Sequence, residues 1–224
     1  MNVSKNTSLL FLVLLTGISA VALPLLLATV NVPIGATSIE QFVSLHTDSN
    51  FKTRASLTFL YFPAAIAIHY LAMPSKGKNK QFFILGFIIF FGGNIIDLLY
   101  RAIQFEVVHF KWAPEYLKAS SEAVQTDIQE KIRLFSELSP AINFSFALLF
   151  FFGRTIMGAS LWLNSTWLEK CASIALIVNG LWNILPHLNN GYGSLLGPYY
   201  VFPWLFSLTF ITFVALKRMH SNSK

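Results

Sequence analysis

The sequence is poor in charge and in cysteine, and each shortage excludes a class of protein. Only 12% of its 224 residues are charged, about half the usual share of a soluble domain, which leaves too little polar surface for a water-soluble globule. Cys171 is the single cysteine, so an intrachain disulfide, a cysteine-based zinc cluster and a CxxC redox pair are excluded. The net charge of +6 comes without a patch of basic and aromatic residues, so we expect no nucleic-acid partner.

The common catalytic and cofactor motifs are also missing. The sequence contains no Walker loop, no GxSxG, no HExxH and no dinucleotide fingerprint. A haem held by two histidines is disfavoured because His69 and His187 are expected in opposite leaflets. His46 and Asp48 are too few groups for a metal site. No lysine lies within an apolar run, so a retinal Schiff base has no place to form. We therefore expect no metal and no other cofactor.

Long apolar runs are what the chain has in abundance, and their length predicts an all-α membrane bundle. A membrane helix needs about 20 apolar residues, and six runs approach that length. We predict one polytopic domain of about six transmembrane helices, at residues 9–30, 55–73, 82–103, 141–163, 167–186 and 199–216. Pro140 fits the first helical position of the fourth span, and Thr166 with Glu169 forms a capping box for the fifth.

The first apolar run has a second interpretation as a signal peptide. Lys5, an apolar stretch and the small residues Ala20–Ala22 resemble such a peptide and its cleavage site. The run continues to Val30, however, whereas the apolar core of a signal peptide is about 7–15 residues long. An uncleaved helix is therefore favoured, and cleavage would leave five spans in the same orientation.

The basic residues predict the orientation of the bundle. Lys76, Lys78 and Lys80 share one short loop, and lysine and arginine favour the cytoplasmic side in short loops. With both termini cytoplasmic, the inner segments carry eight basic residues and one acid, and the outer segments carry six basic residues and eight acids. A small basic multi-pass chain of this kind is common in bacteria, so we expect the lipid bilayer of a bacterial cytoplasmic membrane.

Residues 104–137 form the one sizeable segment outside the apolar runs, and an amphipathic pattern begins at Pro114. Apolar residues recur there at helical spacing, together with oppositely charged pairs three or four residues apart. They are Leu117, Val124, Ile128, Ile132 and Phe135, with the pairs Glu115–Lys118, Asp127–Lys131 and Glu130–Arg133. We expect a helix over 114–137 that caps the bundle or lies on the outer leaflet. The alternative is a lid, or a docking surface for a homo-oligomer or a membrane partner.

Polar residues interrupt the apolar runs at helical spacing, which predicts a polar pocket. Groups three or four positions apart share one helix face, and the expected orientation places all of them in the outer leaflet. The candidate ligand-binding residues are Asn94, Asp97, Arg101, Asn143, Asn179, Asn183 and His187. The structural alternative is that Asp97 and Arg101 neutralise each other while the asparagines pack helices together. Gly92 and Gly93 would let a neighbouring helix approach closely.

Two further ionisable residues lie within apolar runs. Arg154 is expected in the inner half of the fourth span. It either extends to the cytoplasmic interface or needs a partner, and no acid lies at its level. His69 is expected near the inner end of the second span, as an interfacial histidine.

Three functions remain open from the sequence alone. The favoured one is binding or transport of a small polar or amphiphilic ligand, or of a proton, through an outward-facing polar pocket. It is favoured because a charge at the bilayer centre costs at least about 2.5–3.5 kcal/mol. The second is a structural or accessory membrane subunit. The third is a membrane-embedded enzyme acting on a lipid or hydrophobic substrate, with Asp97 and His187 as acid–base candidates and Arg101 holding an anionic group.

Overall fold

The computed structural model describes residues 49–75, 77–162, 166–188 and 201–222, together with the isolated positions Thr7, Leu10 and Val43. Within these ranges all regular structure is helical, which confirms the all-α prediction for this part of the chain. The predicted first span apart from Leu10, its signal-peptide alternative and the pair His46 and Asp48 lie outside the described residues.

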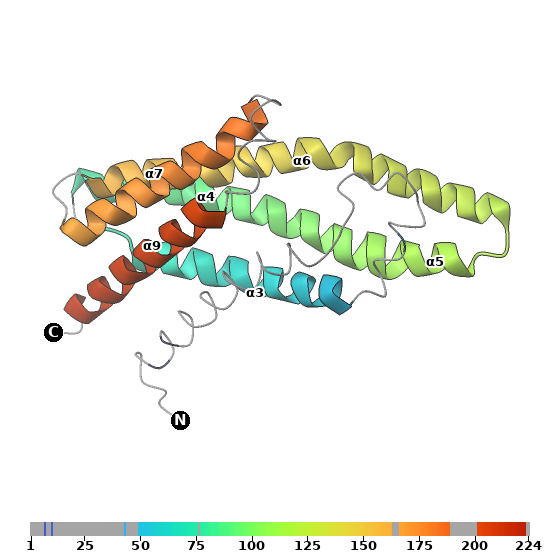
Figure 1. The fold of residues 1–224 in the computed structure, drawn as a ribbon, viewed down its shortest axis with the longest axis horizontal. Coiled ribbons are helices and arrows are strands. Elements are labelled where there is room, and N and C mark those ends of the chain that lie inside the picture. The colour runs from blue at the N-terminus through green and yellow to red at the C-terminus, as the bar shows by residue number, and fades with distance from the viewer. Residues whose placement is uncertain are drawn as a thin grey trace.

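A long helical hairpin dominates the structure, and the other helices pack around one half of it (Figure 1). The helices are α3 (Ser49–Leu71), α4 (Lys78–Ala102), the π-helix η2 (Ile103–Trp112), α5 (Ala113–Lys118), α6 (Glu122–Trp162), α7 (Trp167–Leu188) and α9 (Val201–Asn222). Together α4, η2 and α5 make one continuous helical arm, and α6 returns beside it as the second arm. α7 packs on α6 and α9, and α3 contacts α4 and α9.

Three helical stretches among the described residues are long and apolar enough to cross a membrane. They are Lys78–Lys118, Glu122–Trp162 and Phe202–Met219, with a shorter apolar helix at Phe59–Leu71. The described residues thus support a transmembrane protein with three such helices and not the six that we predicted. Of the remaining predicted spans, the first lies outside the described residues, and the second and fifth correspond to α3 and α7, which are not among the three.

α6 runs through Pro140 without interruption, and the single helix predicted over 114–137 is wrong, because the break at residues 119–121 divides it between α5 and α6. Packing on both sides of the proline explains the continuity. Before it, Ile128 and Ile132 are buried with Val108 of η2, and after it Phe150 packs on Phe90 of α4 with ring centroids 4.9 Å apart. A proline in a helix removes one N–H and crowds one carbonyl, and contacts with the other arm hold both flanks of α6 in place.

Each arm of the hairpin is longer than a membrane is thick. Both arms have 41 residues, or about 60 Å of helix, against a hydrocarbon core of about 30 Å. The half of α6 near the turn carries the predicted ion pairs, with Lys131 Nζ 2.6 Å from Asp127 and Arg133 Nη2 2.5 Å from Glu130. A charge inside the hydrocarbon is costly, so we expect the turn end of the hairpin to project from the bilayer.

Close backbone approach joins α4, α6 and α7 into a unit that we call the three-helix frame. A Cβ atom added to Gly93 of α4 would lie 2.6 Å from the backbone nitrogen of Phe150 in α6. One added to Gly180 of α7 would lie 2.6 Å from the carbonyl oxygen of Phe151. The predicted close approach at this pair of glycines is confirmed for Gly93, whereas a Cβ at Gly92 would have nothing within 4 Å.

α3 and α9 are joined by contacts near both ends of α9, and we call them the α3–α9 pair. Trp204 Nε1 of α9 donates a hydrogen bond to the Tyr61 hydroxyl of α3 at 2.8 Å, and their rings meet edge to face. At the other end, Arg218 donates to the carbonyl oxygen of Ala72, just after α3. Burial of these aromatic side chains at the helix contact stabilises the pair.

Polar side chains connect the α3–α9 pair to the frame at the end where α7 begins. Arg218 Nη2 lies 2.5 Å from Glu169 of α7, and Lys217 Nζ donates to the Thr166 hydroxyl at 3.2 Å. The backbone N–H of Thr166 donates to Glu169 Oε2 at 2.8 Å, as the predicted capping box requires. Glu169 therefore both caps α7 and holds the end of α9.

Candidate functional site

The strongest candidate for a functional site is Arg154 in α6. It lies eight residues before the end of the helix at Trp162, or about 12 Å along its axis. Its side chain is 0% exposed, so the alternative that it extends to the membrane interface is wrong. Asn179 of α7 and Ser207 of α9 lie against the guanidinium, and their helices keep it from reaching the surface.

Among the described residues, neutral groups and aromatic rings surround this guanidinium, and no carboxylate pairs with it. Nη1 donates to Asn179 Oδ1 at 2.6 Å and, more weakly, to Ser207 Oγ at 3.4 Å. The guanidinium carbon lies 4.8 Å from the ring centre of Phe150 and 5.7 Å from that of Phe90, within reach of a cation–π attraction. No ion pair of the described residues includes Arg154. An intramembrane arginine without a carboxylate partner is a functional-site hypothesis by default.

α3 supplies two more polar side chains to this centre. The buried Tyr61 hydroxyl lies close enough to Arg154 to interact with its charge. His69 is also fully buried, its ring 4.4 Å from that of Phe90 and its Nδ1 atom 2.7 Å from the carbonyl oxygen of Ala65. The prediction of an interfacial histidine is therefore wrong, because α4 covers the ring. We call Tyr61, His69, Phe90, Phe150, Arg154, Asn179 and Ser207 the arginine cluster.

The arginine cluster has more hydrogen-bond donors than acceptors. Arg154 Nε and Nη2 and the Asn179 amide nitrogen are buried and make no hydrogen bond within the described structure, although the Tyr61 hydroxyl is near the guanidinium. His69 Nε2 is likewise without a partner among the described residues, and so is one nearby acceptor, Asn94 Oδ1. Nε and Nη2 form one edge of the guanidinium, the edge that binds both oxygens of a carboxylate or phosphate. The cluster is therefore chemically suited to an anion.

The polar residues predicted on α4 lie near this cluster or further along the helix. Asn94 is buried, and its amide nitrogen donates to the Phe90 carbonyl oxygen at 2.7 Å. Asp97 is buried and forms the i,i+4 ion pair of the structural alternative, with its Oδ1 atom 3.3 Å from Arg101 Nε. Arg101 also donates to Gln104 Oε1 at 3.1 Å and is partly exposed. Only Asn94 of these three touches a member of the cluster in these contacts.

Of the polar residues predicted on α6 and α7, some contact the arginine cluster and others lie away from it. Asn179 is a member of the cluster, and Asn183 donates to the backbone carbonyl oxygen of Asn179 at 2.8 Å, one turn away. Asn143 lies half-buried on α6, eleven residues before Arg154. The side chain of His187 lies outside the described residues. The structure thus brings Asn179 into contact with Arg154 and places Asn183 one turn further along α7, in contact with Asn179.

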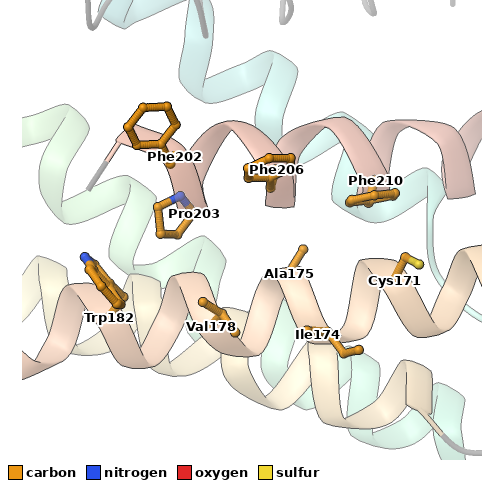
Figure 2. A pocket seen from close by; sticks show the side chains of 9 residues that line it. All are labelled: Cys171, Ile174, Ala175, Val178, Trp182, Phe202, Pro203, Phe206 and Phe210. Atoms are coloured by element: carbon orange, nitrogen blue, oxygen red, sulfur yellow. The ribbon is translucent and has the colours of Figure 1, made fainter. Parts of the chain in front are cut away.

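An apolar groove runs along the contact between α7 and α9 (Figure 2). Its volume is about 550 Å³, and its lining is Cys171, Ile174, Ala175, Val178, Trp182, Phe202, Pro203, Phe206 and Phe210. Val178 and Phe206 directly precede Asn179 and Ser207 in the sequence. The groove and the arginine cluster therefore lie on the two sides of one helix contact.

Comparison with known proteins identifies no relative. No family model matches the sequence, and neither a curated protein nor a solved structure gives a match. Among the described residues, no three His, Cys, Asp or Glu side chains come together as metal ligands. The function therefore has to be argued from the arginine cluster and the groove.

Sequence reasoning missed how the cluster is assembled. Tyr61, Ser207 and Phe90 were not candidates, because a tyrosine, a serine and a phenylalanine in apolar helices are ordinary. One signal was present in the sequence, since Arg154 lies in a span with no acid at its level. A buried charge has to be paired or hydrogen-bonded, so neutral polar groups of neighbouring spans were the remaining partners. Which of them face Arg154 depends on how the helices are rotated against each other.

Proposed function

We propose that this chain is a multi-pass membrane protein that binds a small anion at Arg154 and carries it across the bilayer. The observation that carries the proposal is the buried guanidinium edge of Nε and Nη2, which makes no hydrogen bond within the described residues. The anion has two oxygens on one face, as a carboxylate or a phosphate does. The basic loop around Lys78 supports an orientation with both termini in the cytoplasm, in a bacterial cytoplasmic membrane.

Charge balance supports an anionic ligand over a cationic or neutral one. A guanidinium keeps its proton in proteins, so Arg154 carries a full positive charge within the bundle. The bond to Asn179 and the two aromatic faces offset part of the cost of that burial. A ligand that accepts from the unused edge adds about 1.5–3 kcal/mol for each hydrogen bond to the charged group. A cation or a ligand without acceptors gains nothing there.

Access to the arginine follows from the way the two helix units are joined. Arg154 and Asn179 both belong to the three-helix frame, and their 2.6 Å bond keeps the guanidinium in place. The α3–α9 pair reaches Arg154 through the 3.4 Å contact with Ser207 and through the nearby Tyr61 hydroxyl. Movement of this pair away from the frame would break both contacts and uncover the arginine. The polar contacts of Arg218 with Glu169 hold one end of α9 in the closed arrangement.

The test is the stabilisation of purified protein by anions. A ligand that binds only the folded state raises stability by about 2.7 kcal/mol at 100 times its dissociation constant. We expect acetate or inorganic phosphate, at constant ionic strength, to raise the melting temperature of the wild type. Arg154→Gln keeps a side chain of similar length but removes the charge and should abolish the shift. Arg133→Gln, at an exposed arginine on the projecting part of α6, is the matched control and should retain it.

Two outcomes would overturn this proposal. One is an equal anion-induced shift in the wild type and in Arg154→Gln, provided that both elute as folded protein from size exclusion. The other is a wild type that no anion stabilises. Arg154→Lys separates charge from shape, because lysine keeps the charge but lacks the planar edge. We expect it to show a smaller shift than the wild type.

A further inference from the structure

The groove between α7 and α9 has an almost purely apolar lining that lies one residue away from the polar partners of Arg154. On α7, Val178 lines the groove and the next residue, Asn179, bonds to Arg154. On α9, Phe206 lines the groove and the next residue, Ser207, contacts Arg154. Figure 2 shows how the side chains of the two helices line the space between them. A molecule lying in the groove has a buried cation immediately behind the helix contact.

We infer that the anion bound by Arg154 is the head group of a long-chain carboxylate, a fatty acid, whose hydrocarbon chain lies in the α7–α9 groove. This inference rests on the proposed function, because it takes Arg154 as the anion site. The carboxylate enters beside Ser207, whose 3.4 Å contact is the weaker of the two bonds of Nη1, and accepts from the unused edge of Nε and Nη2. The chain remains outside, against the aromatic rings of α9.

The dimensions favour a single chain with a small head. The volume of about 550 Å³ falls within the roughly 300–1,000 Å³ of known ligand sites. Along α7 the lining extends from Cys171 to Trp182, or about 16 Å of helix. Arg154 is enclosed by side chains from α3, α4, α7 and α9. A carboxylate is small enough to pass between two helices, whereas the glycerol backbone and second chain of a phospholipid are not.

Charge complementarity identifies the head group, and the lining identifies the chain. The lining supplies no ionised group, and the indole N–H of Trp182 makes no hydrogen bond within the described residues. An uncharged hydrocarbon would fill the groove but leave Arg154 unchanged. A short carboxylate would pair with Arg154 but leave the groove empty. Only an amphiphile satisfies both features together.

Quenching of Trp182 fluorescence by a brominated fatty acid tests this inference. The protein would be purified and placed in lipid nanodiscs, and the signal of interest is the saturable quenching that Trp182→Phe removes. We expect the brominated fatty acid to saturate this signal at a concentration at least about tenfold lower than its methyl ester does. The reason is that the ester lacks the negative charge that would accept hydrogen bonds from Arg154. Arg154→Gln should remove that difference between acid and ester.

A pair of substitutions on α7 tests the position of the chain. Val178→Phe narrows the groove, whereas Leu181→Phe changes a comparably exposed side chain that does not line it. We expect Val178→Phe to weaken quenching by the fatty acid at least about tenfold, from the lost apolar burial, and Leu181→Phe to leave it unchanged. Both variants should keep the stabilisation by acetate, because neither residue contacts Arg154.

The outcomes distinguish this inference from the proposed function. Equal affinities for acid and ester, unaffected by Arg154→Gln, would mean that only bilayer lipid occupies the groove, and the inference would be wrong. If acetate still stabilises the protein through Arg154 in that case, the proposed anion site stands without its chain. If the stabilisation by acetate also fails to depend on Arg154, both proposals fall.

Discussion

Two adjacent glycines of α4 offer the sharpest test of the packing around the arginine cluster. Gly93 faces α6, and a Cβ atom there would lie 2.6 Å from the backbone nitrogen and 2.9 Å from the Cα atom of Phe150. Gly92 faces away, and a Cβ atom there would meet nothing within 4 Å. Substituting each by alanine changes the same atoms in the same helix, so effects on the unfolded chain are shared between the two variants.

The expected difference follows from ordinary contact distances. Non-bonded carbon atoms pack at about 3.5–4.0 Å. Gly93→Ala therefore increases the separation of α4 and α6 by about 1 Å at this level. Overpacking of this kind costs about 1–3 kcal/mol, and the obstacle is backbone that cannot change rotamer. Gly92→Ala should instead be neutral or stabilising by up to about 1 kcal/mol, because alanine is the better helix former. The two variants should therefore differ by at least about 1 kcal/mol.

Unfolding by sodium dodecyl sulfate, followed by circular dichroism in mixed micelles, measures this difference. Gly93→Ala should unfold at a lower detergent fraction than the wild type, and Gly92→Ala at an equal or higher one. Since the ring of Phe150 lies against Arg154, Gly93→Ala should also weaken stabilisation by acetate. Equal stability of the two variants would show that α4 and α6 are not in backbone contact at Gly93, and the three-helix frame would be refuted.

Two further predictions concern the hairpin. With Cys171→Ser as background, a cysteine at Ser120 should react with an impermeant maleimide added to intact cells, whereas one at Lys78 should react only after permeabilisation. Reaction of both in intact cells would contradict a membrane crossing by α4. The hydrogen bond from Arg133 lowers the pKa of Glu130, so this bond stabilises α6 at neutral pH and is lost as the pH falls through that lowered value. The advantage of wild type over Glu130→Gln in thermal melting should accordingly shrink on acidification, and an advantage that grows would exclude this explanation.

Features that depend on helix geometry alone could be predicted from the sequence. The contact of Thr166 with Glu169 and the pair Asp127–Lys131 appear in the structure as expected, because residues three or four apart always meet on a helix. The close approach at Gly93 is of the same kind, since only a small residue permits it. Each of these predictions needed no knowledge of a neighbouring helix.

Features that depend on tertiary contacts were predicted poorly. Pro140 was taken as the start of a span, but the packing of Ile132 and Phe150 on either side of it keeps α6 continuous. A local signal worth about 3 kcal/mol or more is outweighed by contacts along the length of the other arm. Of the six predicted spans, three correspond to helices of the described residues that are long and apolar enough to cross a membrane, and the first lies outside the described residues.

The arginine cluster needed the depth and rotation of several helices at once. The sequence marked Asn179 as a polar residue in an apolar helix, but not that its oxygen would accept from Arg154. His69 was placed at the interface because it lies near the end of an apolar run, and the ring of Phe90 instead covers it. A rotation of α7 or α9 by one residue would turn the polar residue that contacts Arg154 toward the groove and its apolar neighbour toward Arg154.

The separation of Arg154 from its partners along the chain has a consequence for biosynthesis. Asn179 follows it by 25 residues and Ser207 by 53, so both are made after α6. At about 5–20 residues per second, the ribosome needs roughly 3–10 s to reach Ser207. During that interval the charge of Arg154 is without its later partners, and placing this part of α6 in the centre of the membrane is energetically costly. The enclosure of Arg154 is thus completed only when the last helix arrives, and a chain that stops before α9 lacks Ser207 and leaves one side of its arginine uncovered.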